Sequence, residues 1–292
     1  MGDSLIVLGR KIDNASDLKA VVRTMKAVAA ANIAQFQQAV LALADYYRTV
    51  ARGLGVCFRE VDATGLTAVV EGKGKVGAII FGSDQGMVGR FNEVITRHAV
   101  TTLGQRAKDA KIWAIGERVR TELIDVGLEP ANFFNVPNSV RAIPAVMTKL
   151  IISTEDHRGS DISELFLFHN SPTRGASYQP VARRLLPLDG IWLSNIASFR
   201  WPSKNLPEII GDRTSTAREF IREYLFVSFF RSCAESLASE NASRLAAMQR
   251  ADQNIEELLK ELQQTFNRER QNGIDEELFD VIADFSALNK AK

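Results

Sequence analysis

Cysteine and histidine are scarce in this chain of 292 residues, which has two cysteines and three histidines. Two cysteines make neither a disulfide framework nor a metal cluster, so Cys57 and Cys233 are expected to be buried thiols in a reducing compartment. His98, His157 and His169 stand far apart, without cysteine or carboxylate partners at ligand spacing. We therefore predict no metal site.

The sequence also lacks an excess of charge, since 36 lysines and arginines face 35 acids. This balance predicts no electrostatic surface for nucleic acid. No continuous run of about 18 apolar residues spans a bilayer, and Leu5–Leu8 is too short for the core of a signal peptide. We expect a soluble or peripheral protein without direct membrane insertion.

Proline is absent from both ends of the chain, because all eight prolines lie between Pro130 and Pro207. From Asp212 to Lys292 there is also only one glycine, Gly273. Proline and glycine are the strongest helix breakers. The C-terminal segment is therefore predicted to be one helix of about 70 residues, on the order of 110 Å long.

The apolar residues of this segment recur at steps of three and four, the pattern of a coiled-coil helix. Thr216, with Glu219 three residues later, predicts a capping box at its start. Asn241, Arg244 and Asp252 interrupt the seam, and they either set the register or face a partner. The apolar positions are Val227, Phe230, Ala234, Leu237, Leu245, Met248, Ile255, Leu258, Leu259, Leu262 and Phe266.

A second amphipathic helix is predicted near the N-terminus, from about Ser16 to about Arg52, with a cap at residues 14–16. Neither long helix can bury its apolar stripe alone, so we expect the two to pair as an antiparallel coiled coil. If Met25 lies level with about Thr265, equal rise along both helices brings residue 57 level with about residue 233, which would make the two cysteines neighbours.

Between these helices, short apolar runs alternate with helical patterns, which predicts an inserted Rossmann-like α/β domain with a small parallel sheet. The expected domains are an N-terminal helix (1–60), the α/β domain (61–208) and a C-terminal helix (209–292). The predicted strands are Val76–Phe81, Lys111–Ile115, Phe133–Val136 and Glu164–His169. The predicted helices are Phe91–Leu103, Glu117–Val126 and Arg141–Ile152.

The segment Ala78–Asn92 runs from the first strand through three glycines towards a helix, where a phosphate loop would lie. A P-loop needs a lysine and a hydroxyl directly after its last glycine, but Arg90 and Phe91 follow Gly89 here. The glycine spacing also differs from the dinucleotide fingerprint. Asp84 is explained most simply as a turn former that accepts hydrogen bonds from backbone amides.

A polar run, Phe266–Leu278, follows near the C-terminus. Such a run is usually a solvated helix face. At the tip of a coiled coil, polar residues on all sides but the seam also suit contact with an enclosing partner.

Three segments together resemble the gamma subunit of F-type ATP synthases, the central rotor shaft. Residues 17–31, Asp-Leu-Lys-Ala-Val-Val-Arg-Thr-Met-Lys-Ala-Val-Ala-Ala-Ala, resemble the family's first helix. Residues 83–92, Ser-Asp-Gln-Gly-Met-Val-Gly-Arg-Phe-Asn, resemble its Ser-Asp-x-Gly-Leu-Cys-Gly-x-x-Asn loop. Residues 266–278 resemble its closing Tyr-Asn-x-x-Arg-Gln-x-x-Ile-x-x-Glu-Leu signature.

The resemblance implies a coiled coil inserted into a ring of alternating alpha and beta subunits, and an α/β domain that rests on a membrane-embedded c-ring beside epsilon. Rotation of this non-catalytic shaft, which needs no cofactor, would shift the catalytic subunits between conformations. Met25 falls where the family's first helix faces the beta-subunit lever. The other implied ring contacts are Arg268, Arg270, Gln271, Ile274 and Glu277. The implied loop near the lever comprises Ser83, Asp84, Gly86, Val88 and Gly89.

The chain departs from the family pattern at several positions. Val88 replaces the usual cysteine, Asp13 and Asn14 stand where basic residues are common, and Gly273 is expected to interrupt the closing helix. These departures suggest a divergent branch, such as the alternate bacterial F-type ATPase. Because the first motif begins almost at once, we expect no transit peptide and a peripheral location on the cytoplasmic side of a bacterial membrane.

Two other functions stay open from the residues alone. One is a nucleotide-binding enzyme built on the α/β domain, and the other is a stand-alone coiled-coil adaptor.

Overall fold

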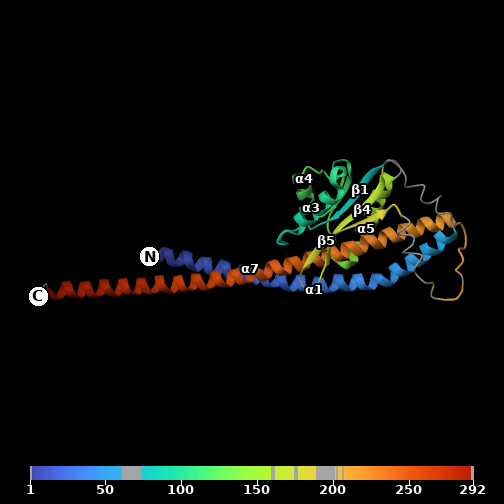
Figure 1. The fold of residues 1–292 in the computed structure, drawn as a ribbon. Coiled ribbons are helices and arrows are strands. Elements are labelled where there is room, and N and C mark those ends of the chain that lie inside the picture. The colour runs from blue at the N-terminus through green and yellow to red at the C-terminus, as the bar shows by residue number, and fades with distance from the viewer. Residues whose placement is uncertain are drawn as a thin grey trace. The chain divides into compact units, whose positions relative to one another are not determined.

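The computed structural model describes residues 2–60, 74–158, 162–173, 177–188, 201, 203–205 and 207–290. It divides into two compact units. The sheet unit is Ala29–Arg244, and the terminal unit combines Met1–Val28 with Leu245–Lys292. Helices α1 (Gly2–Glu60) and α7 (Arg213–Lys290) contribute to both units (Figure 1).

Both long helices start elsewhere than predicted. Helix α1 begins at Gly2, so residues 14–16 lie within the helix and do not cap it. Helix α7 is capped by Asp212, whose Oδ2 accepts a hydrogen bond from the Ser215 amide at 2.7 Å. Thr216 is not the cap, and its hydroxyl donates to the Asp212 carbonyl. Gly273 does not interrupt α7, because one glycine costs a long helix only about 1 kcal/mol.

Helix α1 contains a stretch that could cross a membrane by length and composition, with a mean hydropathy of 1.3. The stretch qualifies because residues 27–44 carry no charge, although polar side chains interrupt the apolar ones. The prediction that the chain has no continuous run of about 18 apolar residues therefore holds for this helix. One such helix is a weak indication, because polar side chains such as Asn32 and Gln35 are costly in hydrocarbon.

The sheet has five strands in the order β3-β2-β1-β4-β5. The first four are mutually parallel, whereas β5 runs antiparallel to β4. All four predicted strands are confirmed, but β5 was not predicted, because Pro180 and a pair of arginines break its apolar pattern. The strands are β1 (Lys75–Phe81), β2 (Lys111–Ile115), β3 (Asn132–Phe134), β4 (Ile162–Pro172) and β5 (Tyr178–Leu186).

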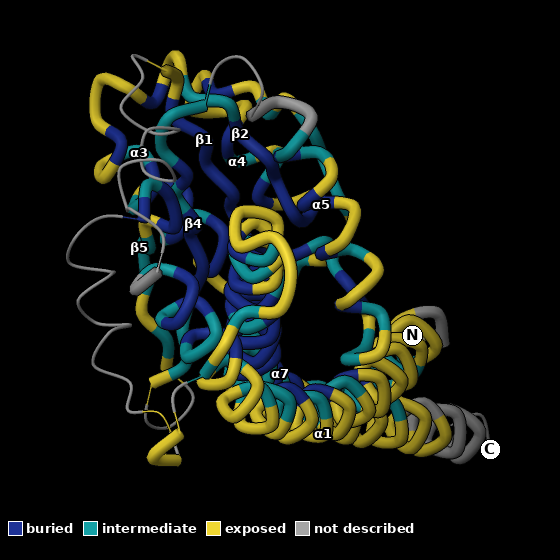
Figure 2. Tube along the Cα trace, turned by 90° about the vertical axis from the view of Figure 1, so that its right-hand side faces the viewer, coloured by how far each residue is buried: buried dark blue, intermediate teal, exposed yellow. Residues whose placement is uncertain are grey.

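Alternation along the strands divides the apolar residues between the two faces of the sheet. Ala78 and Ile80 belong to a cluster with α3 and α4, whereas Ile79 and Phe81 belong to a cluster with α5, α1 and α7 (Figure 2). Within the sheet unit, the two long helices therefore help to cover one face. The shorter helices are α3 (Phe91–Leu103), η1 (Gly104–Asp109), α4 (Glu117–Asp125), η2 (Val140–Ala142) and α5 (Ile143–Arg158).

The antiparallel pairing of α1 and α7 is confirmed, but in a different register. In the terminal unit, Met25 packs against the cluster of Val22, Met248 and Ile255. It therefore lies level with residues near 250 and not with Thr265. Apolar periodicity shows which face of each helix is buried, but it does not show how far one helix is shifted along the other. The sequence therefore did not reveal the register of α1 against α7.

The same shift separates the two cysteines. In the sheet unit, a Cβ on Gly53 would lie 2.3 Å from the Phe220 ring. Cys57 is about one turn further along α1, so it lies level with about residue 216. The prediction that Cys57 and Cys233 are neighbours is therefore wrong. Both thiols are buried and neither takes part in a disulfide.

Candidate functional site

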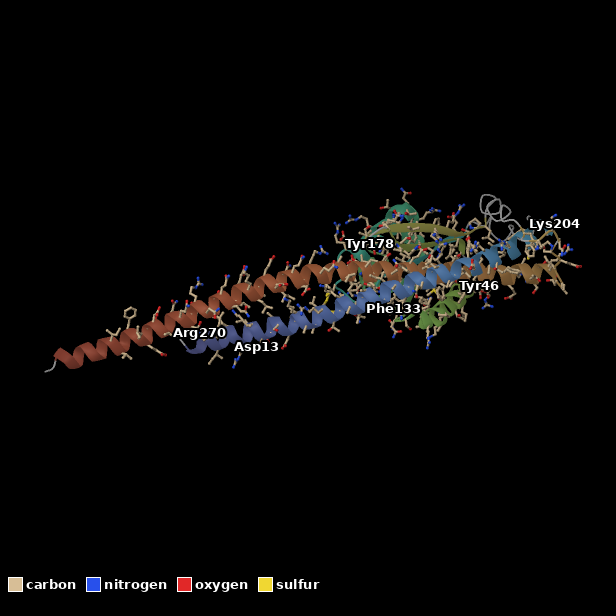
Figure 3. The ribbon with its side chains drawn as sticks, turned by 90° about the horizontal axis from the view of Figure 1, so that it is seen from below. Asp13, Tyr46, Phe133, Tyr178, Lys204 and Arg270 are labelled. Carbon is tan, nitrogen blue, oxygen red and sulfur yellow. The ribbon has the colours of Figure 1, made fainter. Side chains whose placement is uncertain are left out.

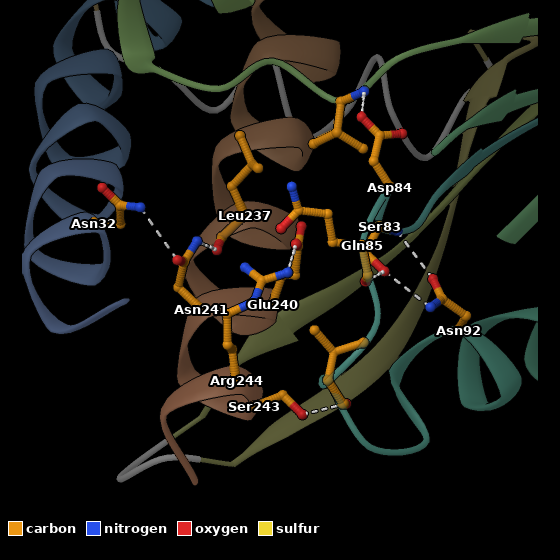
Figure 4. A network of polar contacts seen from close by, with 12 residues as sticks. Asn32, Ser83, Asp84, Gln85, Asn92, Leu237, Glu240, Asn241, Ser243 and Arg244 are labelled. Carbon is orange, nitrogen blue, oxygen red and sulfur yellow. Dashed lines mark hydrogen bonds and ion pairs between the residues drawn. The ribbon is translucent and has the colours of Figure 1, made fainter. Parts of the chain in front are cut away.

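The loop after β1, residues 82–90, lies at the point where the order of the parallel strands reverses. Strand β1 has β2 on one side and β4 on the other, and both are parallel to it. Open α/β sheets bind their ligands beside such a point, at the carboxyl ends of the strands. If the sheet unit binds a ligand, the site is therefore expected at this loop (Figure 4).

The first residues of the loop are held by buried hydrogen bonds. The Ser83 amide donates to Asn92 Oδ1 at 2.9 Å, and Asn92 Nδ2 donates to Ser83 Oγ at 2.9 Å. The backbone of Gly116 approaches closely, because a Cβ there would lie 2.8 Å from the Ser83 amide nitrogen. Ser83 is fully buried as a result, so its hydroxyl serves the loop and does not face solvent.

Asp84 binds two backbone amides with its two carboxylate oxygens. Oδ1 accepts from the Glu117 amide at 3.0 Å, and Oδ2 accepts from the Val136 amide at 2.9 Å. Glu117 is the first residue of α4, and a helix N-terminus is where a bound phosphate would be held. The carboxylate of the chain itself occupies that position. Asp84 therefore joins the loop to the start of α4 and to the segment after β3, and it is not the local turn former that the sequence predicted. The N-terminus of α4 is not free to hold a phosphate.

The tip of the loop combines a buried and an exposed side chain. Val88 is buried, whereas Met87 is 61% exposed and has a φ of 60°. A positive φ in a residue other than glycine is strained and often marks a functional site. Gly89 also has a positive φ, which leaves room for the turn into α3.

Helix α7 holds the loop from the other side. Ser243 Oγ donates to the Val88 carbonyl at 2.6 Å. Arg244, the next residue along α7, donates to Glu240 Oε1 at 2.6 Å, and both side chains are largely buried (Figure 4). Burial raises the pKa of Glu240, although Arg244 acts against this and Asp84 acts with it. Asn32 Nδ2 of α1 donates to Asn241 Oδ1 at 3.3 Å.

A second buried polar cluster joins α7 to β4. Glu235 Oε2 lies 2.8 Å from His169 Nε2 and accepts from Ser171 Oγ at 3.1 Å, while Oε1 accepts from Arg231 Nε at 2.7 Å. Burial lowers the pKa of His169, so the ring is neutral and donates through Nε2. Burial alone would raise the pKa of Glu235, but hydrogen bonds from His169 and Arg231 hold it at about 2.

Sequence reasoning did not single out Glu235, Glu240 or Ser243 as site residues. The available signal was the run of small and polar residues at 232–244, inside a segment that otherwise has an apolar seam. Two of the three noted interruptions contact α1 across the helix pair. Asn241 pairs with Asn32, and Asp252 pairs with Lys26 at 2.7 Å.

The other predicted site residues belong to the terminal unit. Met25 is half-buried in the seam between α1 and α7. The predicted ring-contact residues of α7 are all exposed (Arg270 is labelled in Figure 3). They are Arg268, Arg270, Gln271, Ile274 and Glu277.

The end of α7 also carries an exposed apolar stripe. Ile274 is 56% exposed and Phe279 is 67% exposed. The spacing of the stripe follows one side of the helix. Its members are Ile274, Leu278, Phe279, Val281 and Ile282.

The histidines do not come together as a metal site. In the described ranges, no group of three histidine, cysteine, aspartate or glutamate side chains could hold a metal ion. His98 contacts the ring of Phe168, and His169 contacts Glu235.

Comparison with known proteins gives consistent matches over the full length. A family model described as "ATP synthase" matches residues 4–288. The ATP synthase gamma chain of Allorhizobium ampelinum is 26% identical, over 98% of this chain and 99% of the relative.

Solved structures agree on the fold. The rotor of the Euglena gracilis mitochondrial ATP synthase in rotational state 1 matches 94% of this chain and all of its own, with a TM-score of 0.63 and 16% identity. The OSCP/F1/c-ring structure of the same enzyme in state 3 contains a chain that matches 100% of this chain and 97% of its own, with a TM-score of 0.66 and 14% identity. Because the family model spans nearly the whole sequence, the chain belongs to the ATP synthase family, as a relative of its gamma chains.

Proposed function

We propose that this chain is the central-stalk rotor of an F-type ATP synthase. It is a subunit without a catalytic site of its own, and it couples ion flow through a membrane c-ring to ATP synthesis or hydrolysis in an alpha/beta ring. Family membership over residues 4–288 supports the assignment. The single structural observation that carries it is the exposed apolar stripe on α7, at the end where the family's closing signature lies.

An exposed apolar stripe on a helix is typical of a surface that a partner covers. The polar positions beside it, Arg268, Arg270, Gln271 and Glu277, are exposed on the same helix and would border the contact. An alpha/beta ring that encloses the helix is the partner that the family assignment supplies. Ile274 then contributes apolar contact, and the charged residues contribute hydrogen bonds at its margin.

The loop after β1 is proposed to lie near the beta-subunit lever. Its buried members, Ser83 and Val88, would hold the loop in shape while Met87 makes the contact. Asp84, Gly86 and Gly89 would support this conformation. Met25 is proposed as a second lever contact, through the part of its side chain that is exposed beside the seam.

The mechanism follows from the asymmetry of the shaft. Three equal catalytic subunits would meet different faces of α1 and α7, and each face would stabilise one conformation by contact. Torque would enter through the α/β domain, which is proposed to rest on the c-ring beside epsilon. The proposed domains are residues 1–60, 61–208 and 209–292.

The complex of such relatives is associated with a membrane, and the matched relative is bacterial. We place the chain as a peripheral subunit on the cytoplasmic side of the bacterial cell membrane. A divergent branch, with protons or sodium ions as the coupling ion, would be identified by the c-subunit gene beside this one.

A nucleotide-binding enzyme is the weaker candidate. The N-terminus of α4, beside the loop after β1, is already bound by Asp84, and the loop itself lacks the lysine and hydroxyl of a P-loop. No observation favours a stand-alone adaptor. Measurable nucleotide affinity of the isolated chain would support the enzyme.

The test uses the chain in the complete complex. Co-purification with alpha, beta and c subunits is expected, and a chain that never associates with them would refute the rotor assignment. Truncation from Phe266 onward should reduce ATP-driven ion pumping, because it removes the apolar stripe and the polar residues beside it. Partial rotation is expected to persist on the remaining shaft.

A matched pair of substitutions separates the stripe from helix length. Ile274→Ser with Leu278→Ser should lower pumping, whereas Glu276→Gln on the same exposed turn should leave it unchanged. Equal pumping by the wild type, the truncated chain and the double variant would show that the proposed contacts are wrong.

A further inference from the structure

Residues 232–242 of α7 are buried without exception, so the helix is enclosed on all sides in this segment. A helix enclosed in this way is normally apolar all round. Here, six of the eleven side chains are serine, glutamate or asparagine. They are Ser232, Glu235, Ser236, Ser239, Glu240 and Asn241.

Glu235 is the one member whose carboxylate bonds to the sheet. It receives hydrogen bonds from His169 and Ser171, which lie two residues apart on β4 and so point to the same face. Arg231, on the preceding turn of α7, binds the second carboxylate oxygen. We call these four residues the Glu235 latch. Glu235 and His169 are almost fully shielded from solvent.

Stability does not explain this arrangement well. Replacing a buried ion pair or polar cluster by apolar side chains of similar volume often leaves stability unchanged or raises it. The attested use of such groups is to select one register between packed elements. The latch is suited to that role, because its hydrogen bonds join a side chain of α7 directly to two side chains of β4.

Rotation about the helix axis is the movement that the latch opposes most strongly. Apolar contacts are non-directional, so a helix can turn against them and find new ones. A shift of one residue turns α7 by about 100° and would leave the Glu235 carboxylate buried without its donors. His169 Nε2 would lose its acceptor at the same time.

We propose that the Glu235 latch fixes the rotation of α7 about its own axis against β4, so that torque passes between the sheet unit and the helix without slip. This inference rests on the proposed rotor function. Glu235, His169 and Ser171 act as positioning residues, because they touch neither nucleotide nor any proposed ring contact.

The test is the double variant His169→Leu/Glu235→Leu in the assembled complex. Both side chains become apolar at similar volume, and Arg231 can extend into solvent because it is 40% exposed. ATP hydrolysis is expected to stay within about twofold of wild type, while ions pumped per ATP fall to less than about half. The unfolding temperature of the isolated chain is expected to be unchanged or higher. An unchanged pumping ratio would overturn the latch.

Two further variants complete the test. Ser239→Ala is the matched control. Ser239 lies in the same buried segment of α7, but its hydroxyl donates to the backbone carbonyl of Glu235 within the helix and not to the sheet. Its pumping ratio should equal that of wild type. Glu235→Gln keeps the shape of the side chain and one acceptor oxygen. Its number of ions pumped per ATP should therefore lie between that of the double variant and that of wild type.

If the double variant does not assemble, Glu235→Gln decides alone. A reduced ratio supports the latch, and a wild-type ratio refutes it. Failure of the wild-type chain to associate with alpha, beta and c subunits would instead refute the proposed function.

Discussion

Helix α7 meets two different environments along its length. In the sheet unit, every side chain from Ser232 to Ala242 is buried. In the terminal unit, among the described side chains of α7, only Met248 and Ile255 are buried. The secondary structure is the same in both units, so the difference comes from what surrounds the helix.

The difference shows which part of the chain has an extensive apolar core of its own. The sheet unit has two extensive apolar clusters, one on each face of its sheet. The terminal unit has one small cluster, in which Val22, Met248 and Ile255 are the buried members. Since its remaining apolar residues are largely exposed, the terminal unit is the part that a partner would stabilise.

The largest effect is expected from a matched pair of substitutions on α7. Phe229 is fully buried in the sheet unit, and Phe279 is 67% exposed in the terminal unit. Phe229→Ala should lower the free energy of unfolding by about 3–5 kcal/mol, because it leaves a cavity. Phe279→Ala should change it by less than about 0.5 kcal/mol. Urea denaturation of the isolated chain measures both, and similar losses would contradict the contrast between the units.

A smaller effect is expected from two glycines with positive φ in the sheet unit. Gly116 has a φ of 117° and faces the backbone of Ser83 at 2.8 Å, whereas Gly127 has a φ of 78° and open space around it. Gly116→Ala should lower the free energy of unfolding by about 1–3 kcal/mol. The alanine strains the backbone at this φ, and its Cβ also displaces the loop. Gly127→Ala should cost about 1 kcal/mol, from strain alone. Equal costs would mean that the loop after β1 is not held rigidly.

The smallest effect concerns the pH dependence of the sheet unit. Burial lowers the pKa of His169 below its ordinary value of 6.5, with Arg183 and Arg231 acting in the same direction and Glu235 against it. The unfolded chain therefore binds more protons than the folded chain as the pH falls below about 6.5. The stability from neutral His169 is complete above that pH and is lost progressively below it.

Denaturation midpoints at pH 7.5 and 5.5 test this expectation. The wild type should lose more stability between these values than His169→Gln, which keeps a donor for Glu235 but does not titrate. His98→Gln is the control for a half-exposed histidine. A wild-type change no larger than that of the His169 variant would show that His169 is not held neutral.

Much of the fold was predictable from local patterns. The helix Phe91–Leu103 and the strand Lys111–Ile115 have the predicted bounds, because apolar periodicity is strong there. Strand β5 was missed, since an edge strand is half-exposed and tolerates Pro180 and charged residues. The cap at Asp212 was missed because Thr216 and Glu219 matched the capping-box pattern one turn later.

The candidate site was predictable only in outline. The position of the loop and the absence of its phosphate-binding residues followed from the motif itself. The bonds from Asp84 to Val136, and from Ser243 to Val88, join residues far apart in the chain, and no local pattern indicates them.

The sequence by itself determined that the chain has two long terminal helices around an α/β domain, because proline, glycine and apolar spacing act within a few residues of one another. Only the tertiary structure decided the register of those helices and the burial of Glu235. Both depend on side chains that meet across the fold, where a hydrogen bond has a direction and an apolar contact does not.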